Sequence, residues 1–321
     1  MKFVVDSGST KADWLLFNKK QYLNVYNTLG LNPEVLSTHV LVERILANEE
    51  IQNLRTSVLE IYFYGSGCST AHSKIIMKDA LQEVFKNATF IEILEDTYAA
   101  AYATCQDLKP GIVCINGTGS NCSFFDGSKL HQAVNSLGYL AMDDCSGVDF
   151  GRKLIRAYYF NTMPTDIKIS FEKAYNLDAS FIKKNFYKEP NPNAYLASFL
   201  PFLIANKKHP YLQEMIKETF KFFIDNYIKQ YVNFKEIPVH FIGSTAFLLK
   251  DEFIEVLNEN QLQVGVFYQK PLDGLMEYQK KKKKGILIKD SFFTMIRFVL
   301  KFKTRSNCEV WTERIMIIII D

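Results

Sequence analysis

The six cysteines of this 321-residue chain form no CxxC pair and no close, even pattern; they stand at positions 68, 105, 114, 122, 145 and 308. This arrangement excludes a disulfide framework. The five histidines likewise lack the spacing that is typical of metal ligands. No signal peptide is recognisable, because Lys2 is followed at once by strand-like sequence and Asp6. We therefore expect a protein of the reduced cytoplasm.

Common nucleotide-binding and hydrolase motifs are also missing. The chain has no G-x-x-x-x-G-K-[ST] sequence, which excludes a P-loop protein, and no G-x-S-x-G nucleophile elbow. The stretch GSGCST, residues 65–70, lacks the third glycine of a dinucleotide-binding fingerprint. These classes can be set aside.

The main part of the chain has little excess charge. The formal net charge is +3, but residues 280–321 hold eleven basic and four acidic side chains, and the rest of the chain holds 27 basic and 31 acidic ones. A mildly acidic body offers no electrostatic footprint for nucleic acid. The apolar run at residues 315–320 is far too short to span a bilayer. We expect neither nucleic acid nor a membrane as a partner.

The segment at residues 280–321 differs from the rest. It begins with five consecutive lysines and ends with IMIIIID. A basic amphipathic segment that touches acidic lipids is one interpretation. We favour another, a reading-frame slip at an adenine-rich run of lysine codons that leaves a non-native C-terminus. Resequencing the gene across those codons tests this hypothesis.

What the chain does contain is α/β alternation in two rounds. An apolar content of 48%, with 26 Phe and 17 Tyr, indicates a globular protein long enough for two domains. The first half is predicted to hold strands at 3–5, 14–17, 22–26, 61–64 and 90–94 and helices at 34–50, 73–85 and 97–104. The second is predicted to hold strands at 111–115, 122–125, 130–134, 239–242 and 264–268, helical sequence at 171–231 and a helix at 246–257. The repeated opening of three short strands indicates a topological duplication.

Four polar or glycine-bearing stretches stand at predicted strand ends. They are DSGSTK (6–11), ED (95–96), INGTGSN (115–121) and FIGSTAF (241–247). In open α/β sheets, ligands bind at the carboxyl ends of strands, where loops and helix N-termini expose N–H groups. Two hydroxyl-rich glycine turns, one in each half, would hold a polyphosphate from opposite sides.

Each stretch alone also has an ordinary structural explanation. The segments 6–11 and 116–119 are compatible with simple turns, and Asp96 with a helix N-cap. The segment 241–247 could be a buried strand before a capped helix, and Asn32, which precedes a proline, could mark a helix start. Their combination, each at a strand end, favours a nucleotide-binding fold.

The set DSGSTKADW, LED, INGTGSN, SLGYLAMDDCSGVDFGRKL and FIGSTAF resembles the N-acetylglucosamine kinase-like family, the BadF/BadG/BcrA/BcrD-type ATPases. This family belongs to the superfamily of sugar kinases, actin and heat-shock chaperones. The resemblance covers residues 1 to about 278 in the family's order. It implies an α/β fold of two ribonuclease H-like, actin-like ATPase domains with a nucleotide cleft between them. We place these domains at 1–112 and 113–279, followed by the atypical basic tail at 280–321.

The resemblance also implies a role for each matching residue. The ATP-binding set would be Asp6, Ser9, Thr10 and Lys11 of a first phosphate loop, Gly117, Thr118 and Gly119 of a second, and Gly243, Ser244 and Ala246 of an adenosine motif. Asp6 would organise Mg²⁺ through water, and Asp96 matches the catalytic base. The sugar-binding set would be Asn32, Ser120, Asn121, Gly138 and Asp143.

The implied activity is transfer of the γ-phosphate of ATP, with Mg²⁺, to an amino sugar, with N-acetylglucosamine and its 6-phosphate as the first expectation. Two alternatives stay open: an ATPase activator of a 2-hydroxyacyl-CoA dehydratase, which carries an iron–sulfur cluster between subunits, and a catalytically weak sugar or nucleotide sensor. The NGTGSN sequence favours the kinase over the activator. The oligomeric state, a homodimer included, is left open.

One departure from the family concerns the sugar-binding segment. The family usually has Gly-Asp-Glu-Gly-Ser where this chain has Met142-Asp143-Asp144-Cys145-Ser146. Glycine allows close backbone approach and a positive φ. Met142 and Cys145 are therefore expected to narrow the site or change its turn, which places substrate identity and turnover in question.

Overall fold

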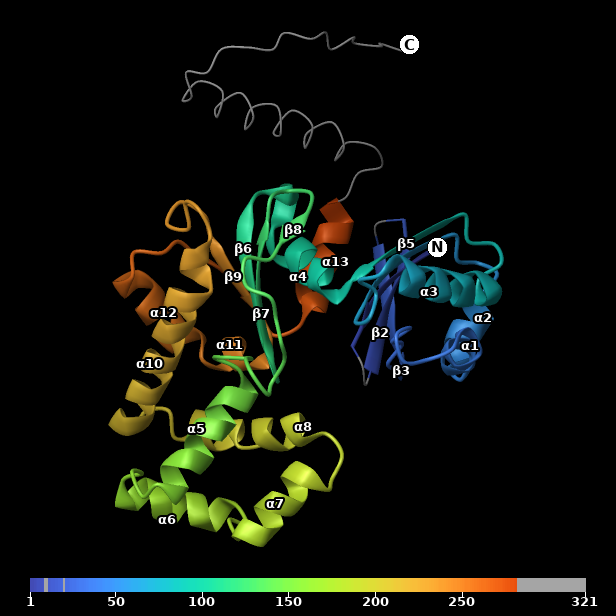
Figure 1. The fold of residues 1–321 in the computed structure, drawn as a ribbon. Helices are drawn as coiled ribbons and strands as arrows, with labels where there is room; N and C mark the ends of the chain where they lie inside the picture. Colours follow the sequence, from blue (N-terminus) through green and yellow to red (C-terminus); the bar gives the residue numbers. More distant parts are fainter. Residues whose placement is uncertain (9–10, 20, 282–321) are drawn as a thin grey trace, which may run out of the picture. The chain divides into compact units, whose positions relative to one another are not determined.

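Two five-stranded sheets of the same topology frame the protein (Figure 1). In the first sheet, β1 (Lys2–Ser7), β2 (Lys11–Asn18) and β3 (Gln21–Leu29) form an antiparallel meander, and β4 (Glu60–Gly65) and β5 (Phe90–Glu95) add parallel to β1. The computed structural model describes residues 1–8, 11–19 and 21–281, so the predicted tail lies outside the described residues from 282 onward.

The second sheet repeats this arrangement. Its meander consists of β6 (Gly111–Asn116), β7 (Ser120–Phe125) and β8 (Leu130–His131), and β9 (Val239–Ile242) and β10 (Val264–Tyr268) add parallel to β6. The strand orders, β3-β2-β1-β4-β5 and β10-β9-β6-β7-β8, are the same when each is read from its meander outward. The predicted duplication and the α/β class are confirmed.

Strand register brings the predicted site loops to one edge of each sheet. Ser7, Gly65 and Glu95 are paired across β1, β4 and β5. In the second sheet, Ile115 pairs with Ile242, which pairs with Tyr268. The loops that follow these strands therefore leave their sheets side by side, as the carboxyl ends of parallel strands do.

The helices of the first half cover one face of its sheet. They are α1 (Thr38–Leu46), α2 (Glu49–Leu54) and α3 (Ala71–Val84). The buried face of α3 includes Met77, Leu81 and Val84, as the periodicity predicts. The prediction of one helix at 34–50 is wrong, because the Asn48 side chain accepts a hydrogen bond from the Ile51 amide and starts a second helix.

The second half carries a larger helical region. It comprises α5 (Gly147–Tyr159), α6 (Thr165–Ala174), α7 (Ala179–Tyr187), α8 (Pro192–Ala197), α9 (Leu200–Ala205), α10 (Pro210–Asn226), the 3-10 turn η2 (Ile228–Gln230), α11 (Ser244–Leu248) and α12 (Lys250–Glu259). The helical sequence predicted at 171–231 is thus divided by turns, and α8 and α10 each begin at a proline. The helix predicted at 246–257 is likewise divided, at Leu249. The strand predicted at 130–134 spans only two residues.

Two helices join the halves. These are α4 (Asp96–Thr104), which is followed by the turn η1 (Gln106–Leu108), and α13 (Pro271–Lys281). Their buried residues, such as Ala99, Ala103 and Leu275, share one apolar cluster with Val4 of β1 and Val113 of β6. Gly274 allows the close contact, since a Cβ there would lie 2.3 Å from the Ala103 carbonyl oxygen. The two sheets are therefore held through the α4–α13 pair.

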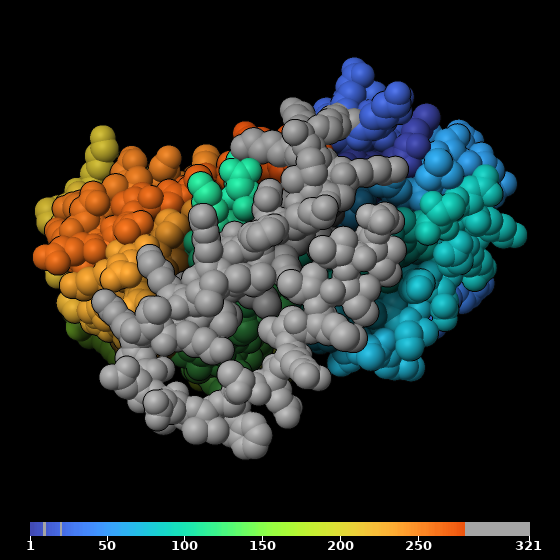
Figure 2. Space-filling model, turned by 90° about the horizontal axis from the view of Figure 1, so that it is seen from above, coloured from blue at the N-terminus to red at the C-terminus, as the bar shows by residue number. Residues whose placement is uncertain are grey.

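No helix within residues 1–8, 11–19 and 21–281 combines the length and apolar composition needed to cross a membrane. Figure 2 views the protein from above, with the first half (blue to cyan) on the right and the last strands and helices of the second half (orange) on the left.

Candidate active site

The first predicted phosphate loop is the β1–β2 hairpin. The Gly8 amide donates to the Lys11 carbonyl at 3.0 Å, and Asp6 pairs directly with Asp13 across the two strands. The exposed Lys11 ammonium lies 2.7 Å from the Asp13 carboxylate. Ser9 and Thr10, predicted to bind phosphate, lie outside the described residues. The structure thus places Asp6 and Lys11 of the predicted set at this hairpin.

Asp6 lies in a concentration of negative charge. Burial first, and then the nearby carboxylates of Asp96 and Asp13, raise the pKa of Asp6 to about 7, although the Lys270 ammonium acts in the opposite direction. Asp6 belongs to the first half, whereas Lys270 follows β10 in the second. No sequence pattern points to Lys270, because 264 positions separate it from Asp6 and only the fold brings the two together.

Asp96, the predicted catalytic base, is the first residue of α4. Glu95 occupies the N-cap position and makes no capping hydrogen bond with its side chain, so Asp96 is not the N-cap. Burial, and then the Glu95 carboxylate, raise the pKa of Asp96 above its ordinary value, while the amides of Thr97 and Asp96 itself act against this shift. The result is a largely buried carboxylate on a rigid helix end, with an increased tendency to take up a proton.

The second predicted phosphate loop links β6 to β7. The Gly117 amide donates to the Gly119 carbonyl at 3.0 Å, and a Cβ at Gly117 would meet no atom within 4 Å. The first turn of α5 holds this loop through two hydrogen bonds. The Gly147 amide donates to the Gly117 carbonyl at 2.8 Å, and the Val148 amide donates to the Thr118 carbonyl at 3.1 Å. The loop is therefore held by its carbonyl groups, with open space beside Gly117.

The predicted adenosine motif contacts the second phosphate loop directly. Gly243 has a φ of +120°, and a Cβ there would lie 2.3 Å from the Asn116 carbonyl oxygen, so only glycine fits. The Thr245 hydroxyl donates to the Gly117 carbonyl at 2.8 Å. Ser244 is exposed, but Ala246 is fully buried in the core of the second half, so its side chain does not line the surface. Thr245, which the sequence reasoning missed, is the residue that joins the two loops.

The predicted sugar-binding segment lies against the same loop. The Ser120 amide donates to an Asp143 carboxylate oxygen at 3.1 Å, and a Cβ at Gly119 would lie 2.6 Å from the other. Gly138 starts the turn that leads to Asp143, since its carbonyl accepts from the Met142 amide at 2.8 Å. The Ser120 hydroxyl is buried and has no hydrogen-bond partner within the described part of the chain.

Cys145 lies in the predicted sugar-binding segment and has a left-handed backbone conformation. Its φ is +58°, the left-handed conformation in which glycine is favoured, and its amide donates to the Asp149 carboxylate at 2.9 Å. Its carbonyl accepts from the Asn116 side chain at 3.0 Å. Cys145 thus adopts the backbone conformation that glycine favours, and the expected effect on substrate and turnover stays a prediction. Burial raises the pKa of its thiol well above the ordinary value. No left-handed conformation is needed at Met142.

Asn32 reaches this region from the loop after β3. The Ser7 hydroxyl accepts from the Leu31 amide at 2.9 Å, which ties that loop to the end of β1. The Asn32 amide group lies directly against Gly67 in the loop after β4. Cys68, the next residue, is buried, and this burial, with Asp96 as the next contribution, raises the pKa of its thiol to about 12.

A cavity of about 270 Å³ opens at the start of α4, where Glu95 and Thr97, but not Asp96, are among its lining residues. It is lined by residues of both halves, namely Cys68, Ser69, Lys74, Glu95, Thr97, Tyr98, Asn121, Ser123, Leu130 and Gln132. Asn121, from the predicted sugar-binding set, is among them, and its side-chain oxygen accepts from the Ser123 hydroxyl at 2.9 Å. Hydroxyl, amide and charged groups therefore surround the cavity, which suits a polyhydroxylated ligand.

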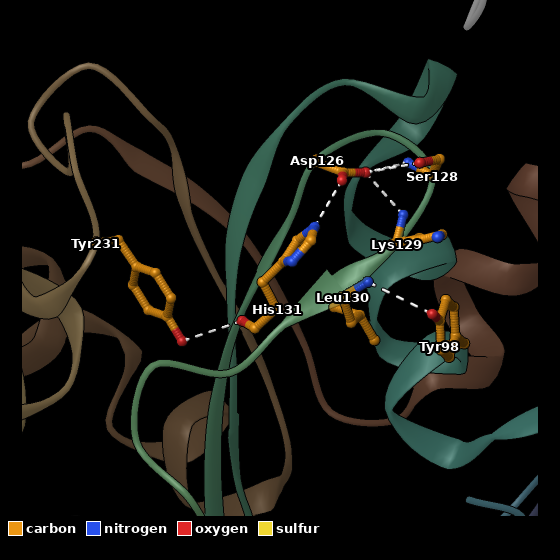
Figure 3. Close-up of polar contacts among 7 residues, drawn as sticks. All are labelled: Tyr98, Asp126, Ser128, Lys129, Leu130, His131 and Tyr231. Atoms are coloured by element: carbon orange, nitrogen blue, oxygen red, sulfur yellow. Dashed lines mark hydrogen bonds and ion pairs between the residues drawn. The ribbon is translucent and has the colours of Figure 1, made fainter. Parts of the chain in front are cut away.

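The β7–β8 hairpin, which carries Asn121 and Ser123, is fixed on both sides (Figure 3). In its turn, Asp126 accepts hydrogen bonds from Ser128, Lys129 and His131. Burial raises the pKa of Asp126, but these hydrogen bonds outweigh it and hold the pKa below its ordinary value. The Leu130 amide reaches the Tyr98 hydroxyl of α4 at 3.5 Å.

No family model and no curated protein matches this chain. The structure of a "putative N-acetylglucosamine kinase" from Porphyromonas gingivalis is 32% identical, with a TM-score of 0.81, over 88% of this chain and 99% of that one. A second protein of the same description, from Chromobacterium violaceum, is 15% identical with a TM-score of 0.63, over 87% and 98% of the two chains. A ROK family glucokinase from Streptomyces griseus, in complex with glucose and AMPPNP, is 12% identical with a TM-score of 0.51, over 88% and 100%.

These likenesses place the chain in a family. The last two show the shared fold, that of the actin-like ATPases. The first, at 32% identity over nearly the whole of the related chain, goes further: this chain belongs to the N-acetylglucosamine kinase-like family.

Proposed function

We propose that this protein is an ATP- and Mg²⁺-dependent sugar kinase that phosphorylates an amino sugar, with N-acetylglucosamine converted to its 6-phosphate as the leading case. The observation that carries the proposal is the position of Asp96. This carboxylate stands on a helix end whose neighbours in sequence, Glu95 and Thr97, line a polar cavity, and it is close enough to Asp6 to raise the pKa of that carboxyl. The family membership, shown by the likeness to a putative N-acetylglucosamine kinase, supports the same reaction.

Nucleotide binding would rest on the two glycine loops. The open space beside Gly117 leaves its backbone accessible, while Thr245 and the first turn of α5 hold the loop's carbonyl groups from the other side. Preorganised backbone groups of this kind stabilise transferring phosphoryl charge without reorganisation. Lys11 of the first loop and Lys270 after β10 add positive charge from both halves.

The residues around Asp6 fit a magnesium ion. The carboxylates of Asp96 and Asp13 both act on the Asp6 carboxyl there. Among the described residues, no three acidic, histidine or cysteine side chains form a ready-made cage, and Mg²⁺ in kinases usually keeps several waters and is held by one or two carboxylates plus phosphates. When bound, the ion would neutralise charge on the phosphates. Asp6 would hold it through water.

Asp96 would take the proton of the attacking sugar hydroxyl. A raised pKa brings this carboxyl nearer to neutral pH, where a general base works best, and such a base contributes about 10²–10⁴-fold to the rate. Asn32, Asn121 and Asp143, as donors and acceptors, would hold the remaining hydroxyls. The unpartnered Ser120 hydroxyl is a further group for the sugar to satisfy.

The two alternatives gain less support. An iron–sulfur activator needs cysteines near the surface, but the five cysteines of the described residues are all buried. The silent sensor was suggested by Met142 and Cys145, which replace glycines of the family. Cys145 nevertheless adopts the left-handed backbone conformation that glycine favours.

The test is a coupled ADP-release assay with N-acetylglucosamine, N-acetylmuramic acid, N-acetylmannosamine, glucosamine and glucose. Sugar-dependent ADP release that Asp96→Asn abolishes supports the proposal and names the substrate. Asp79→Asn, which removes an exposed carboxylate of α3 that does not line the cavity, is the control and should retain turnover. Absence of sugar-dependent release across the whole panel would contradict the kinase.

A further inference from the structure

A second cavity, of about 320 Å³, is lined by residues of the helical region of the second half. Its walls come from α5, α7, α8 and the turn before Asp143, and its lining residues are Tyr139, Leu140, Arg152, Ile155, Arg156, Phe186, Tyr187, Pro192 and Leu196. It shares no lining residue with the cavity at the start of α4. The two cavities are therefore separate sites.

The two charged side chains that line this cavity, Arg152 and Arg156, are both positive. Arg152 and Arg156 stand four residues apart on α5, so their side chains lie on the same face of the helix. No acidic residue lines the cavity, and neither guanidinium forms an ion pair with a carboxylate of the described residues. Arg152 donates to the Tyr139 carbonyl, and Arg156 lies 4.8 Å from the centre of the Phe160 ring. Both retain further N–H donors for a ligand.

The opposite wall is aromatic and aliphatic. Phe186 is partly buried and packs edge-on against Tyr195 at 5.5 Å, so its position is fixed. Leu140 and Tyr187, in contrast, are 84% and 82% exposed at the rim, which is unusual for apolar side chains of this size. A ligand with a ring would cover them.

The cavity is also connected to the second phosphate loop. Arg152 holds the turn that contains Tyr139, and α5, on which both arginines stand, fixes Gly117 and Thr118 through its first two amides. Occupancy of the cavity would therefore act on a helix that already supports the candidate active site.

We propose that this cavity is a binding site for a phosphate monoester carried on a ring-bearing small molecule. Two guanidiniums match the charge of about −1.5 to −2 that a phosphate monoester carries near pH 7, and arginine pairs with phosphate oxygens in bidentate geometry. A single carboxylate would leave one guanidinium uncompensated. The ring lies on the aromatic wall. The inference does not rest on the proposed function, because it concerns other residues and a different readout.

The experiment is calorimetric titration of the full-length protein at pH 7.5, without nucleotide, with phenyl phosphate as the probe. We expect saturable binding that is tighter than that of benzoate or inorganic phosphate. Arg156→Gln should weaken it by about tenfold or more, since each hydrogen bond to a charged group is worth that much. Arg55→Gln, which removes an exposed guanidinium from the first half, is the control and should change the affinity by less than about twofold.

A second pair of variants guards against a folding defect in the first. Leu140→Glu places a carboxylate at the exposed rim and should abolish binding, whereas Leu140→Gln, of equal size, should not. Equal affinity in the native protein, Arg156→Gln and Leu140→Glu would place the probe elsewhere, such as at the phosphate loops, and overturn the proposal. Titration with N-acetylglucosamine 6-phosphate separates two ligand sources: binding sensitive to Arg156→Gln identifies a sugar phosphate, and its absence identifies another phosphate ester.

Discussion

Replacing Asp6 by Asn should make the free protein more stable and at the same time inactive. The carboxyl of Asp6 has a pKa of about 7 in the folded protein, against 3.8 for an ordinary aspartate. Each pKa unit corresponds to about 1.4 kcal/mol, so keeping this group ionised in the folded state costs about 4 kcal/mol at most. Screening by water at this partly exposed residue reduces that figure, and we expect about 1–3 kcal/mol.

The sign of the pH dependence follows from the raised pKa. Below about pH 4 the Asp6 carboxyl is protonated in both the folded and the unfolded chain, and it imposes no cost. Between about pH 4 and 7 the unfolded chain releases the proton while the folded protein still holds it, so the stability contributed by Asp6 is lost as the pH rises. The neutral asparagine side chain of the variant does not titrate. The gain from Asp6→Asn should therefore be present at pH 8 and vanish at pH 4.

Thermal unfolding at pH 4, 6 and 8 measures this effect in the absence of nucleotide and metal. A gain of about 1–3 kcal/mol corresponds to a rise of several degrees in Tm at pH 8 for a chain of this size. Asp79→Asn, on the exposed face of α3, is the control and should leave the pH profile of Tm unchanged. An Asp6→Asn variant that is no more stable than the native protein at pH 8 would refute the reasoning. If the kinase proposal is right, the same variant should lose turnover by about 100-fold or more.

Three further outcomes are expected. Glu95→Gln should shift the acidic limb of kcat/KM to lower pH, because Glu95 helps to raise the pKa of Asp96 and a base must be ionised to act; a pH–rate profile that stays in place would contradict this role. Gly243→Ala should cost about 2 kcal/mol or more and weaken nucleotide binding, because its Cβ meets the Asn116 carbonyl, whereas Gly117→Ala should keep stability within about 0.5 kcal/mol; denaturant unfolding and nucleotide titration compare the two. Cys145→Val should cost about 2–3 kcal/mol in denaturant unfolding, because a β-branched residue is strained at a φ of +58°, whereas Cys145→Gly should stay within about 1 kcal/mol.

The sequence predicts most of the framework because its signals are local. Short apolar runs such as 3–5 and 111–115 are bounded by turn residues, and their order repeats in both halves, so the duplicated sheets can be anticipated. The breaks within the helical region are harder to predict. Asn48 and Leu249 interrupt apolar periodicity that continues across them, and the local caps that divide the helices are visible only in the structure.

The site was predictable as a set of loops but not as a set of contacts. Strand ends and glycines mark the segments at 6–11, 115–121 and 241–247, and strand register brings them to the sheet edges. The contact of the Thr245 hydroxyl with the Gly117 carbonyl spans 128 positions. Pairings of this kind depend on how the chain folds back, which no local pattern encodes.

The departure at Cys145 is better explained by a retained turn than by a lost function. A left-handed cysteine costs about 1–2 kcal/mol relative to glycine, so a chain with no use for this turn would be free to relax it. Instead, the Cys145 amide and carbonyl are both engaged, with Asp149 and Asn116, and Asn116 directly precedes the Gly117 loop. Cys145 thus carries the backbone strain. Its hydrogen bond with Asn116 ties the predicted sugar-binding segment to the predicted second phosphate loop. Backbone strain persists only where the surroundings enforce it, and it clusters at functional sites. This position is therefore compatible with the proposed kinase, in which Cys145 fills the core behind the turn and the Asp143 carboxylate accepts from the Ser120 amide.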